Sequence, residues 1–312
     1  SFYICWNRLL ASKIRNELEL ENLTNCEVKQ YISFLYSLDK EHRFIDFEDF
    51  TGDVDILSEK VNGLMQYLRS QEDFKPYDYI IIDEAQDTFD KNIASVLNNL
   101  TSSLCNGLEY GRYLVFYDTE QGYKKDLRDL ESYAESLNRY GCRFLLNENK
   151  RVPTNREIVE YANMLLTNDE LNISTLFNDI NQQHTDAITI HRFKGAKEVV
   201  RFIRDKISKI KDESLDWSAY TLLFDSHMKK LPYSGDETIY DRIFDMENTK
   251  ELTIQNIGKI EKRLQFTSIL SYKGLENKHI ILLMNNRTEV DRFELYVGMT
   301  RAIYDLELLI LE

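Results

Sequence analysis

The sequence predicts an α/β protein with two domains, each built on a parallel β-sheet. Short apolar stretches that suit buried strands alternate along the chain with stretches of helical periodicity, which is the pattern of parallel strands joined by crossover helices. One such stretch, Ile80–Ile82, leads directly into Asp83 and Glu84. A length of 312 residues leaves room for two hydrophobic cores. We place the domains at residues 1–142 and 143–312.

The first domain begins with a predicted strand and a helix that follows it. Asn7 is a favourable N-cap for a helix that starts at Arg8. Residues from about 20 to 75 read as a small insertion of short helices and acidic loops, and a further helix is expected over about 90–104. The predicted strands of this half and of the domain boundary are Phe2–Trp6, Ile80–Ile82, Arg112–Tyr117 and Arg143–Leu146.

The second domain shows the same alternation. Helices are expected around Ile158–Leu165, from Glu198 to about Ile210 and around Leu295–Ala302. Residues of about 225–262 are polar and acidic, and we interpret them as a second small insertion. The predicted strands are Ala187–His191, Tyr220–Phe224, Phe266–Ile269, His279–Leu283 and Leu306–Ile310.

Composition excludes several classes of protein. The apolar stretches are too short to span a bilayer, so no membrane association is expected. Four scattered cysteines without metal-ligand spacing indicate reduced thiols in a cytoplasmic protein. The net charge of −14 argues against a general polyanion-binding surface, although a local groove or stacking on aromatic side chains still permits nucleic-acid binding.

The acid pair after Ile80–Ile82 is the most specific signal in the chain. A buried strand that ends in two carboxylates can present one acid to a metal ion and the other to a water. The alternative is an acidic strand end that caps the next helix. The longer string Asp83–Asp87, Asp-Glu-Ala-Gln-Asp, resembles motif II of superfamily 1 helicases of the UvrD, Rep and PcrA type. That resemblance implies that Asp83 holds Mg²⁺ and that Glu84 is the base for the attacking water.

Further motifs of this family follow in order through the chain. Phe116–Gln121 resembles motif III, which implies that Gln121 senses the γ-phosphate, although Tyr117 and Thr119 replace the usual Gly and Pro. Leu146–Arg151 resembles motif IV, whose arginine, here Arg151, contacts the γ-phosphate.

The second half carries the remaining matches. Ser268–Glu276 resembles motif V, with Leu270 where the family usually has His, and Tyr296–Ala302 resembles motif VI, whose Arg301 would act as an arginine finger. The resemblance assigns Lys273, Gly274 and Glu276 to nucleotide binding, with Glu276 on the ribose. It assigns contacts with nucleic acid to Trp6, Asn7, Tyr123, Ser268 and Tyr272; the first two belong to a stretch similar to motif Ia.

Each match alone has a structural explanation, such as a surface ion pair for Arg151 or Arg301 and a turn for Gly274. Their common order favours the family. The resemblance therefore implies two RecA-like domains with reduced accessory insertions. ATP and Mg²⁺ would bind between the domains, and hydrolysis would drive movement on single-stranded DNA or at DNA junctions, in the 3′ to 5′ direction. A nuclease or another DNA-processing protein would fit as a partner or fused domain.

One expected motif is missing. No Gly-x-x-x-x-Gly-Lys-Ser/Thr loop occurs in the sequence, and we expect that loop upstream of Ser1. The chain alone should therefore lack ATPase activity. Two alternatives stay open: a non-catalytic helicase-fold module of a DNA-processing or defence complex, and an RNA-directed enzyme of the same superfamily.

Overall fold

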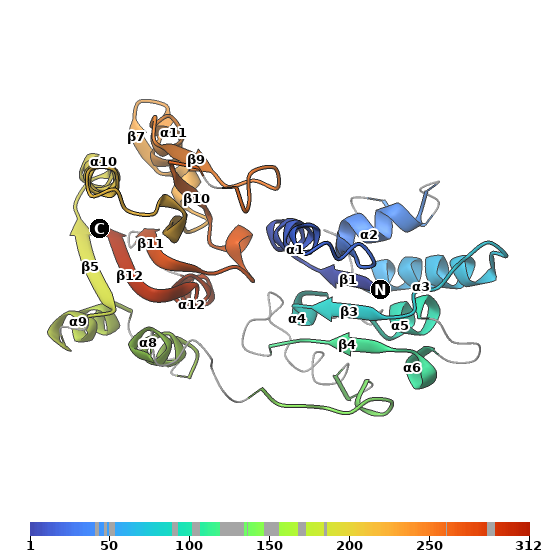
Figure 1. Cartoon of the computed structure of the whole chain (residues 1–312). Helices are drawn as coiled ribbons and strands as arrows, with labels where there is room; N and C mark the ends of the chain where they lie inside the picture. Colours follow the sequence, from blue (N-terminus) through green and yellow to red (C-terminus); the bar gives the residue numbers. More distant parts are fainter. Residues whose placement is uncertain are drawn as a thin grey trace. The chain divides into compact units, whose positions relative to one another are not determined.

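The structure is a computed structural model that divides into two compact units, Ser1–Leu146 and Asn147–Glu312. This division lies close to the predicted boundary after residue 142. Figure 1 shows the helices and strands of both units. The structure describes residues 1–40, 44–46, 49, 54–88, 93–101, 107–118, 134–135, 137–146, 156–167, 173–183, 186–259, 261–285 and 291–312.

The first unit is built on a parallel sheet of four strands in the order β2-β1-β3-β4. The strands are β1 (Phe2–Cys5), β2 (Glu27–Gln30), β3 (Ile80–Asp83) and β4 (Tyr113–Val115). Because every pairing is parallel, the carboxyl ends of all four strands lie at one edge of the sheet. The register places Cys5 opposite Asp83 at that edge.

Helices connect these strands, as expected for parallel pairing. The described helices are α1 (Arg8–Leu20), α2 (Tyr31–Leu38), α3 (Val54–Ser70), α4 (Ala85–Thr88), α5 (Ile93–Leu100) and α6 (Gly107–Tyr110). Helix α1 starts at the predicted cap, where Oδ1 of Asn7 accepts hydrogen bonds from the backbone N–H groups of Leu9 (2.7 Å) and Leu10 (3.3 Å).

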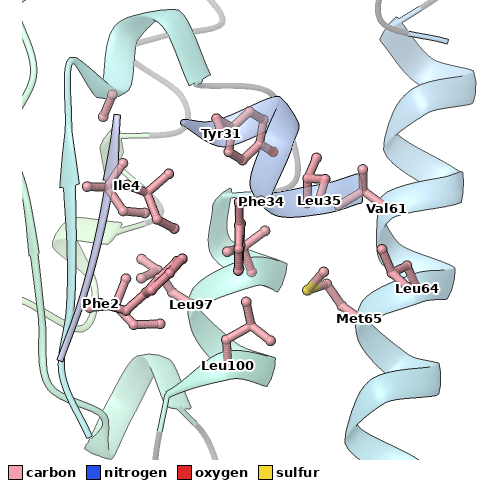
Figure 2. Close-up of a cluster of buried hydrophobic side chains, with 14 of the residues drawn as sticks. Phe2, Ile4, Tyr31, Phe34, Leu35, Val61, Leu64, Met65, Leu97 and Leu100 are labelled. Carbon is pink, nitrogen blue, oxygen red and sulfur yellow. The ribbon is translucent and has the colours of Figure 1, made fainter. Parts of the chain in front are cut away.

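One face of this sheet forms the hydrophobic core. Figure 2 shows Phe2 and Ile4 of β1 among side chains of the covering helices, including Phe34 of α2, Leu97 of α5 and Met65 of α3. These five side chains are almost fully buried. Burying a large apolar side chain contributes about 1.5–3 kcal/mol to the free energy of folding, so this layer is the main source of stability of the unit.

The opposite face becomes progressively more exposed toward β4. Tyr3, Ile81 and Leu114 lie side by side on β1, β3 and β4. Tyr3 and Ile81 are partly buried, whereas Leu114 is 44% exposed, and Phe116 just beyond β4 is 43% exposed. In the described part of the unit, β4 pairs with β3 alone.

Two parts of the first unit differ from the sequence prediction. The segment of about 20–75, interpreted as an insertion, contributes β2 to the sheet itself and contains the 17-residue helix α3. The strand predicted at Arg143–Leu146 is wrong, since these residues form no strand and Phe144 and Leu146 are more than four-fifths exposed. An apolar run becomes a strand only where another strand pairs with it, and none does here.

The second unit contains a parallel sheet of six strands in the order β5-β12-β11-β6-β10-β9. The predicted strands of this half are all present with small changes at their ends. The six strands are β5 (Ile188–Phe193), β6 (Tyr220–Phe224), β9 (Thr249–Glu251), β10 (Leu264–Ser268), β11 (Asn277–Asn285) and β12 (Ala302–Leu311).

Helices cover both faces of this sheet, as two-sided burial of parallel strands requires. Figure 1 shows α10 and α11 on one side and α8, α9 and α12 on the other. The helices are α8 (Arg156–Thr167), α9 (Ile173–Gln183), α10 (Ala196–Asp212), α11 (Ile239–Phe244) and α12 (Arg292–Met299). Ile203 of α10 packs with Leu222, Ile281 and Leu309 in one core cluster.

The segment of about 225–262, interpreted as an insertion, is more regular than expected. It contains a short 3₁₀-helix, η4 (Met228–Lys230), a two-stranded hairpin of β7 (Pro232–Ser234) and β8 (Glu237–Thr238), and helix α11. It also supplies β9, the edge strand of the main sheet, so the segment is partly integral to the fold.

Candidate functional site

Asp83 lies at the carboxyl end of β3, and its carboxylate is held from two directions. The hydroxyl of Tyr3, on the neighbouring strand β1, donates a hydrogen bond to Oδ2 of Asp83. The backbone N–H of Glu84 donates to Oδ1 (2.9 Å). Burial, followed by the charge of Asp83, raises the pKa of Tyr3 above its ordinary value, so the phenol keeps the proton that it donates.

Glu84 is positioned by an unusual backbone conformation and by Gln86. The φ angle of Glu84 is +51°, in the left-handed region that costs a residue with a side chain about 1 kcal/mol or more. Nε2 of Gln86 donates to Oε2 of Glu84 (2.5 Å), while Oε1 of Gln86 accepts from the backbone N–H of Asp118 (3.0 Å). Gln86 is 3% exposed, so it links Glu84 to the chain beyond β4 from a buried position.

A buried thiol lies beside the acid pair. Cys5 pairs with Asp83 in the sheet, and its Sγ lies 3.4 Å from the backbone oxygen of Asn7. Burial, with Asp83 and Glu84 as further causes, raises the pKa of Cys5 to about 12. Cys5 is therefore a neutral thiol near pH 7, unsuited to nucleophilic work.

The carboxylates at the carboxyl edge of the first sheet suit a metal ion that takes most of its oxygen ligands from a bound nucleotide and from water. In the described part of the chain, no group of three or more His, Cys, Asp or Glu side chains is arranged to hold a metal. A nucleotide-bound Mg²⁺ typically takes only one or two protein carboxylates, and phosphates and waters supply the other oxygens. Each oxygen of Asp83 accepts one hydrogen bond and keeps a second lone pair, so Asp83 fits this smaller role.

Trp6 and Asn7, assigned to nucleic acid by resemblance, have structural contacts in the first unit. The Asn7 side chain caps α1. Trp6 is partly buried against the core, with its ring centroid 6.4 Å from that of Tyr31. These contacts fix the position of both residues at the carboxyl edge of β1 and leave part of each side chain accessible.

The second unit brings Ser268 and Tyr272 together in one turn after β10. Oγ of Ser268 donates to Oγ of Ser271 (2.8 Å) and accepts from the Ser271 backbone N–H (3.3 Å). Tyr272 ends the 3₁₀-helix η5 (Leu270–Tyr272) and is 5% exposed. Its hydroxyl donates to the backbone oxygen of Glu276 (3.2 Å), and burial raises its pKa to about 12. Ser268 thus remains accessible, whereas Tyr272 is part of the packing.

Lys273, Gly274 and Glu276 form the turn that enters β11. Lys273 is 4% exposed, and its Nζ lies 5.7 Å from the centroid of the Phe293 ring, within the range of a cation–π contact. Gly274 has a φ of +78°, which glycine adopts without strain. Glu276 is exposed at the same turn.

Arg301 is buried between α12 and the turn before β11. Its side chain donates to the backbone oxygens of Val297 (3.0 Å) and Leu275 (3.2 Å), and to the Thr300 hydroxyl (2.9 Å). At 2% exposed, the guanidinium connects the segments 268–276 and 296–302 inside the second unit.

A pair of buried acids near the carboxyl end of β6 was not singled out by the sequence. Oδ1 of Asp225 accepts from the backbone N–H groups of His227 (2.9 Å) and Met228 (3.0 Å). Glu294 of α12 accepts from the backbone N–H (2.9 Å) and hydroxyl (3.0 Å) of Ser226. Both acids are 3% exposed, and burial raises the pKa of each. A strand followed by Asp-Ser was the available signal for Asp225, but Glu294 looks like any helical surface residue.

The remaining assigned residues, Gln121, Tyr123 and Arg151, lie outside the described residues. The other site residues therefore form two groups, one at the edge of the first sheet and one in the turns of the second unit. No helix among the described residues is long and apolar enough to cross a membrane.

No family model matches the chain, and no curated protein matches it. Among solved structures, the chain is similar to the C-terminal domain of a possible DNA helicase from Lactobacillus plantarum WCFS1, at 14% identity and a TM-score of 0.34. That match covers 51% of this chain and 86% of the other.

Proposed function

We propose that this chain belongs to a UvrD-like superfamily 1 helicase, in which each unit is a RecA-like domain and ATP hydrolysis drives movement along single-stranded DNA. The observation that carries the proposal is the acid pair at the end of β3. Asp83 and Glu84 are the only strand-end acids in the described part of the chain that a tyrosine and a buried glutamine hold in place together. The ordered series of motifs from Trp6 to Arg301 supports the same reading.

The first unit would supply the groups that handle the attacking water. Asp83 would hold Mg²⁺, which shields the phosphate charge when bound. Glu84 would accept the proton of the water, with its carboxylate oriented by Gln86. The link from Gln86 to the backbone of Asp118 ties this base to the start of the segment that resembles motif III.

The open side of the first sheet supports a further strand next to β4. In the described part, β4 has one partner strand. Leu114 within β4 and Phe116 just after it are more than two-fifths exposed. Parallel strands are normally buried on both faces and flanked by others. We propose that a strand leading into a Gly-Lys-Ser/Thr phosphate-binding loop pairs here, so that the loop lies at the same edge as Asp83.

The test uses a protein that includes such a loop. Glu84→Gln should abolish DNA-stimulated ATP hydrolysis and leave ATP binding intact, because the amide cannot accept the proton. Glu109→Gln, an exposed acid of the same unit, is the matched control and should hydrolyse ATP normally. Turnover by Glu84→Gln at the control rate would overturn the assignment of the base.

The same measurements separate the other readings. The 312-residue chain alone should not hydrolyse ATP, since it contains no phosphate-binding loop. A longer natural protein without that loop would favour a non-catalytic module. Stimulation of ATPase activity by RNA in place of DNA would indicate the RNA-directed enzyme.

A further inference from the structure

Helix α10 carries a continuous stripe of basic side chains on one exposed side. At 3.6 residues per turn, Lys197, Arg201, Arg204 and Lys211 all point within about 40° of one direction, and Ser208 fills the remaining position. All of these side chains are exposed. The stripe extends over about 21 Å at 1.5 Å per residue. The helix has six basic and three acidic residues, in a chain with a net charge of −14.

The apolar side of α10 is already used by the fold. Val199, Ile203, Ile207 and Ile210 are buried against the sheet, so the basic stripe is not needed for packing. Its ion pairing within the helix is weak: the Arg201–Asp205 pair has an N–O distance of 4.0 Å, and both side chains are more than 70% exposed. Such a pair contributes little to stability and leaves Arg201 available to a ligand.

The acidic residues of the helix form a second line beside the stripe. Glu198, Asp205 and Asp212 each follow a basic residue by one position and repeat every seven residues. This line confines the positive surface to a narrow track on one side of α10. A narrow track suits one phosphate backbone better than a broad polyanionic surface.

We propose that the α10 stripe binds the sugar-phosphate backbone of a nucleic-acid strand. The stripe itself contains no apolar side chain, whereas a protein interface usually has apolar anchors at its centre. A phosphate backbone needs only cations, and the arginines can bind phosphate oxygens in pairs. The contact is additional to the proposed motor site, because β5, which precedes α10, is separated from the Ser268 strand β10 by three strands.

One end of the stripe continues into a hollow of about 460 Å³. Lys194, Lys197 and Glu198 line it on the α10 side, and Pro232 and Tyr233 of the β7–β8 hairpin line it on the other. Gly195 at the N-cap offers no side-chain cap to the first turn of α10. Lys194 adds one cation beyond Lys197 at this end of the stripe, and Glu198 in the first turn offsets part of the positive charge of the helix N-terminus.

The test measures binding of a fluorescent oligothymidylate of about 20 nucleotides to the whole chain by anisotropy, over a range of salt concentrations. The triple variant Arg201→Gln, Arg204→Gln and Lys211→Gln should bind about tenfold or more weakly. The slope of log K against log salt should fall by about 2, as expected when three phosphate contacts to a single strand are lost. The matched control, Lys209→Gln, Lys250→Gln and Lys262→Gln, removes the same charge from exposed positions of the same unit and should bind like the unmodified chain.

Several results would overturn the proposal: equal affinity and slope in the stripe variant, an equal loss in the control, or displacement of the oligonucleotide by polyglutamate as readily as by unlabelled DNA. Circular dichroism of the stripe variant should be unchanged, since the substituted side chains are exposed. The binding assay requires no ATP hydrolysis, so failure of the proposed ATPase activity and failure of the stripe contact are distinguishable outcomes.

Discussion

The phenol of Tyr3 donates a hydrogen bond to the carboxylate of Asp83, across two adjacent parallel strands. The contact joins β1 and β3 at the edge where the proposed chemistry takes place. It also fixes the direction of the Asp83 side chain before any ligand binds, because the second oxygen accepts from the next backbone N–H. Tyr3 is thus a positioning residue for Asp83.

Tyr3→Phe should lower the free energy of unfolding of the first unit by about 1 kcal/mol, since it removes one hydrogen bond to a partly buried carboxylate. The chain has two tryptophans, Trp6 in the first unit and Trp217 in the second. Urea unfolding followed by fluorescence in a Trp217→Phe background therefore reports on the first unit. Tyr79→Phe, at a tyrosine before β3, is the control, and an equal loss there would show that the Asp83 contact is unimportant.

Arg301→Ala should destabilise the second unit by about 3 kcal/mol. The change leaves the backbone oxygens of Leu275 and Val297 without their guanidinium donor in a buried position. Arg301→Lys should also destabilise it, because one ammonium cannot reproduce three divergent hydrogen bonds. Urea midpoints from Trp217 fluorescence in a Trp6→Phe background test this, with the exposed Arg204→Ala expected to change stability by less than about 0.5 kcal/mol.

This prediction bears on activity measurements. If Arg301→Ala leaves the second unit as stable as before, its hydrogen bonds contribute nothing and any loss of ATPase activity reflects contact with the nucleotide. If the expected loss of stability is found, Arg301→Ala alone cannot establish an arginine finger.

Glu294→Gln should increase the stability of the second unit relative to the unmodified protein, and this gain should grow as the pH rises. Burial, followed by the charge of Asp225, raises the folded-state pKa of Glu294 above its ordinary value of 4.5. The folded state therefore holds the proton more tightly than the unfolded chain. The penalty for ionising Glu294 is absent below the unfolded pKa and builds up as the pH rises through 4.5 to the folded pKa.

The measurement compares urea midpoints of the two proteins between acidic and neutral pH. Glutamine has no such penalty, so the stability difference in its favour should grow through this window and then become constant. Altered hydrogen bonds to Ser226 should add a part of the difference that does not change with pH, so only the pH-dependent part reports on the ionisation of Glu294. The exposed Glu247→Gln should show no comparable trend, and a flat difference for Glu294→Gln would contradict the burial argument.

Gly298→Ala should destabilise the second unit by about 1–3 kcal/mol through overpacking. A Cβ at this position would lie 3.0 Å from both terminal methyl carbons of Leu282 and 3.4 Å from Cδ1 of Ile269. Leu282 and Ile269 are fully buried, so neither has open space to move into. Thermal or urea unfolding measures the change. In a double-mutant cycle, Leu282→Val should reduce the cost of the alanine, and independent effects would refute the proposed clash.

The sequence was most informative where apolar residues are consecutive. Ile80–Ile82 and Tyr220–Phe224 became strands because a short run of consecutive apolar residues suits a strand inside a parallel sheet. The edge strands β2 and β9 escaped prediction, since Glu-Val-Lys-Gln and Thr-Lys-Glu carry charged residues that only an edge position tolerates. Their pairing depends on distant parts of the chain, which a local pattern does not contain.

The candidate site shows the same division. The place of Asp83 follows from the end of an obvious strand. The roles of Tyr3 and Gln86 depend on strand register and on the left-handed turn at Glu84, which no local pattern reveals. Likewise, the sequence predicted Arg301 as an arginine finger. The hydrogen bonds that its side chain donates to Val297 and Leu275 depend on how α12 packs against the turn before β11, which the sequence does not show.

In the described part of the first unit β4 is an edge strand, and this has a consequence for handling the protein. A strand at the edge of a sheet presents free backbone N–H and C=O groups, and here apolar side chains such as Leu114 stand next to them. The same surface invites edge-to-edge pairing between copies of the chain, which is the usual start of aggregation in β-proteins. Aggregation of the isolated first unit should therefore increase with its concentration, and a peptide strand that pairs with β4 should reduce it.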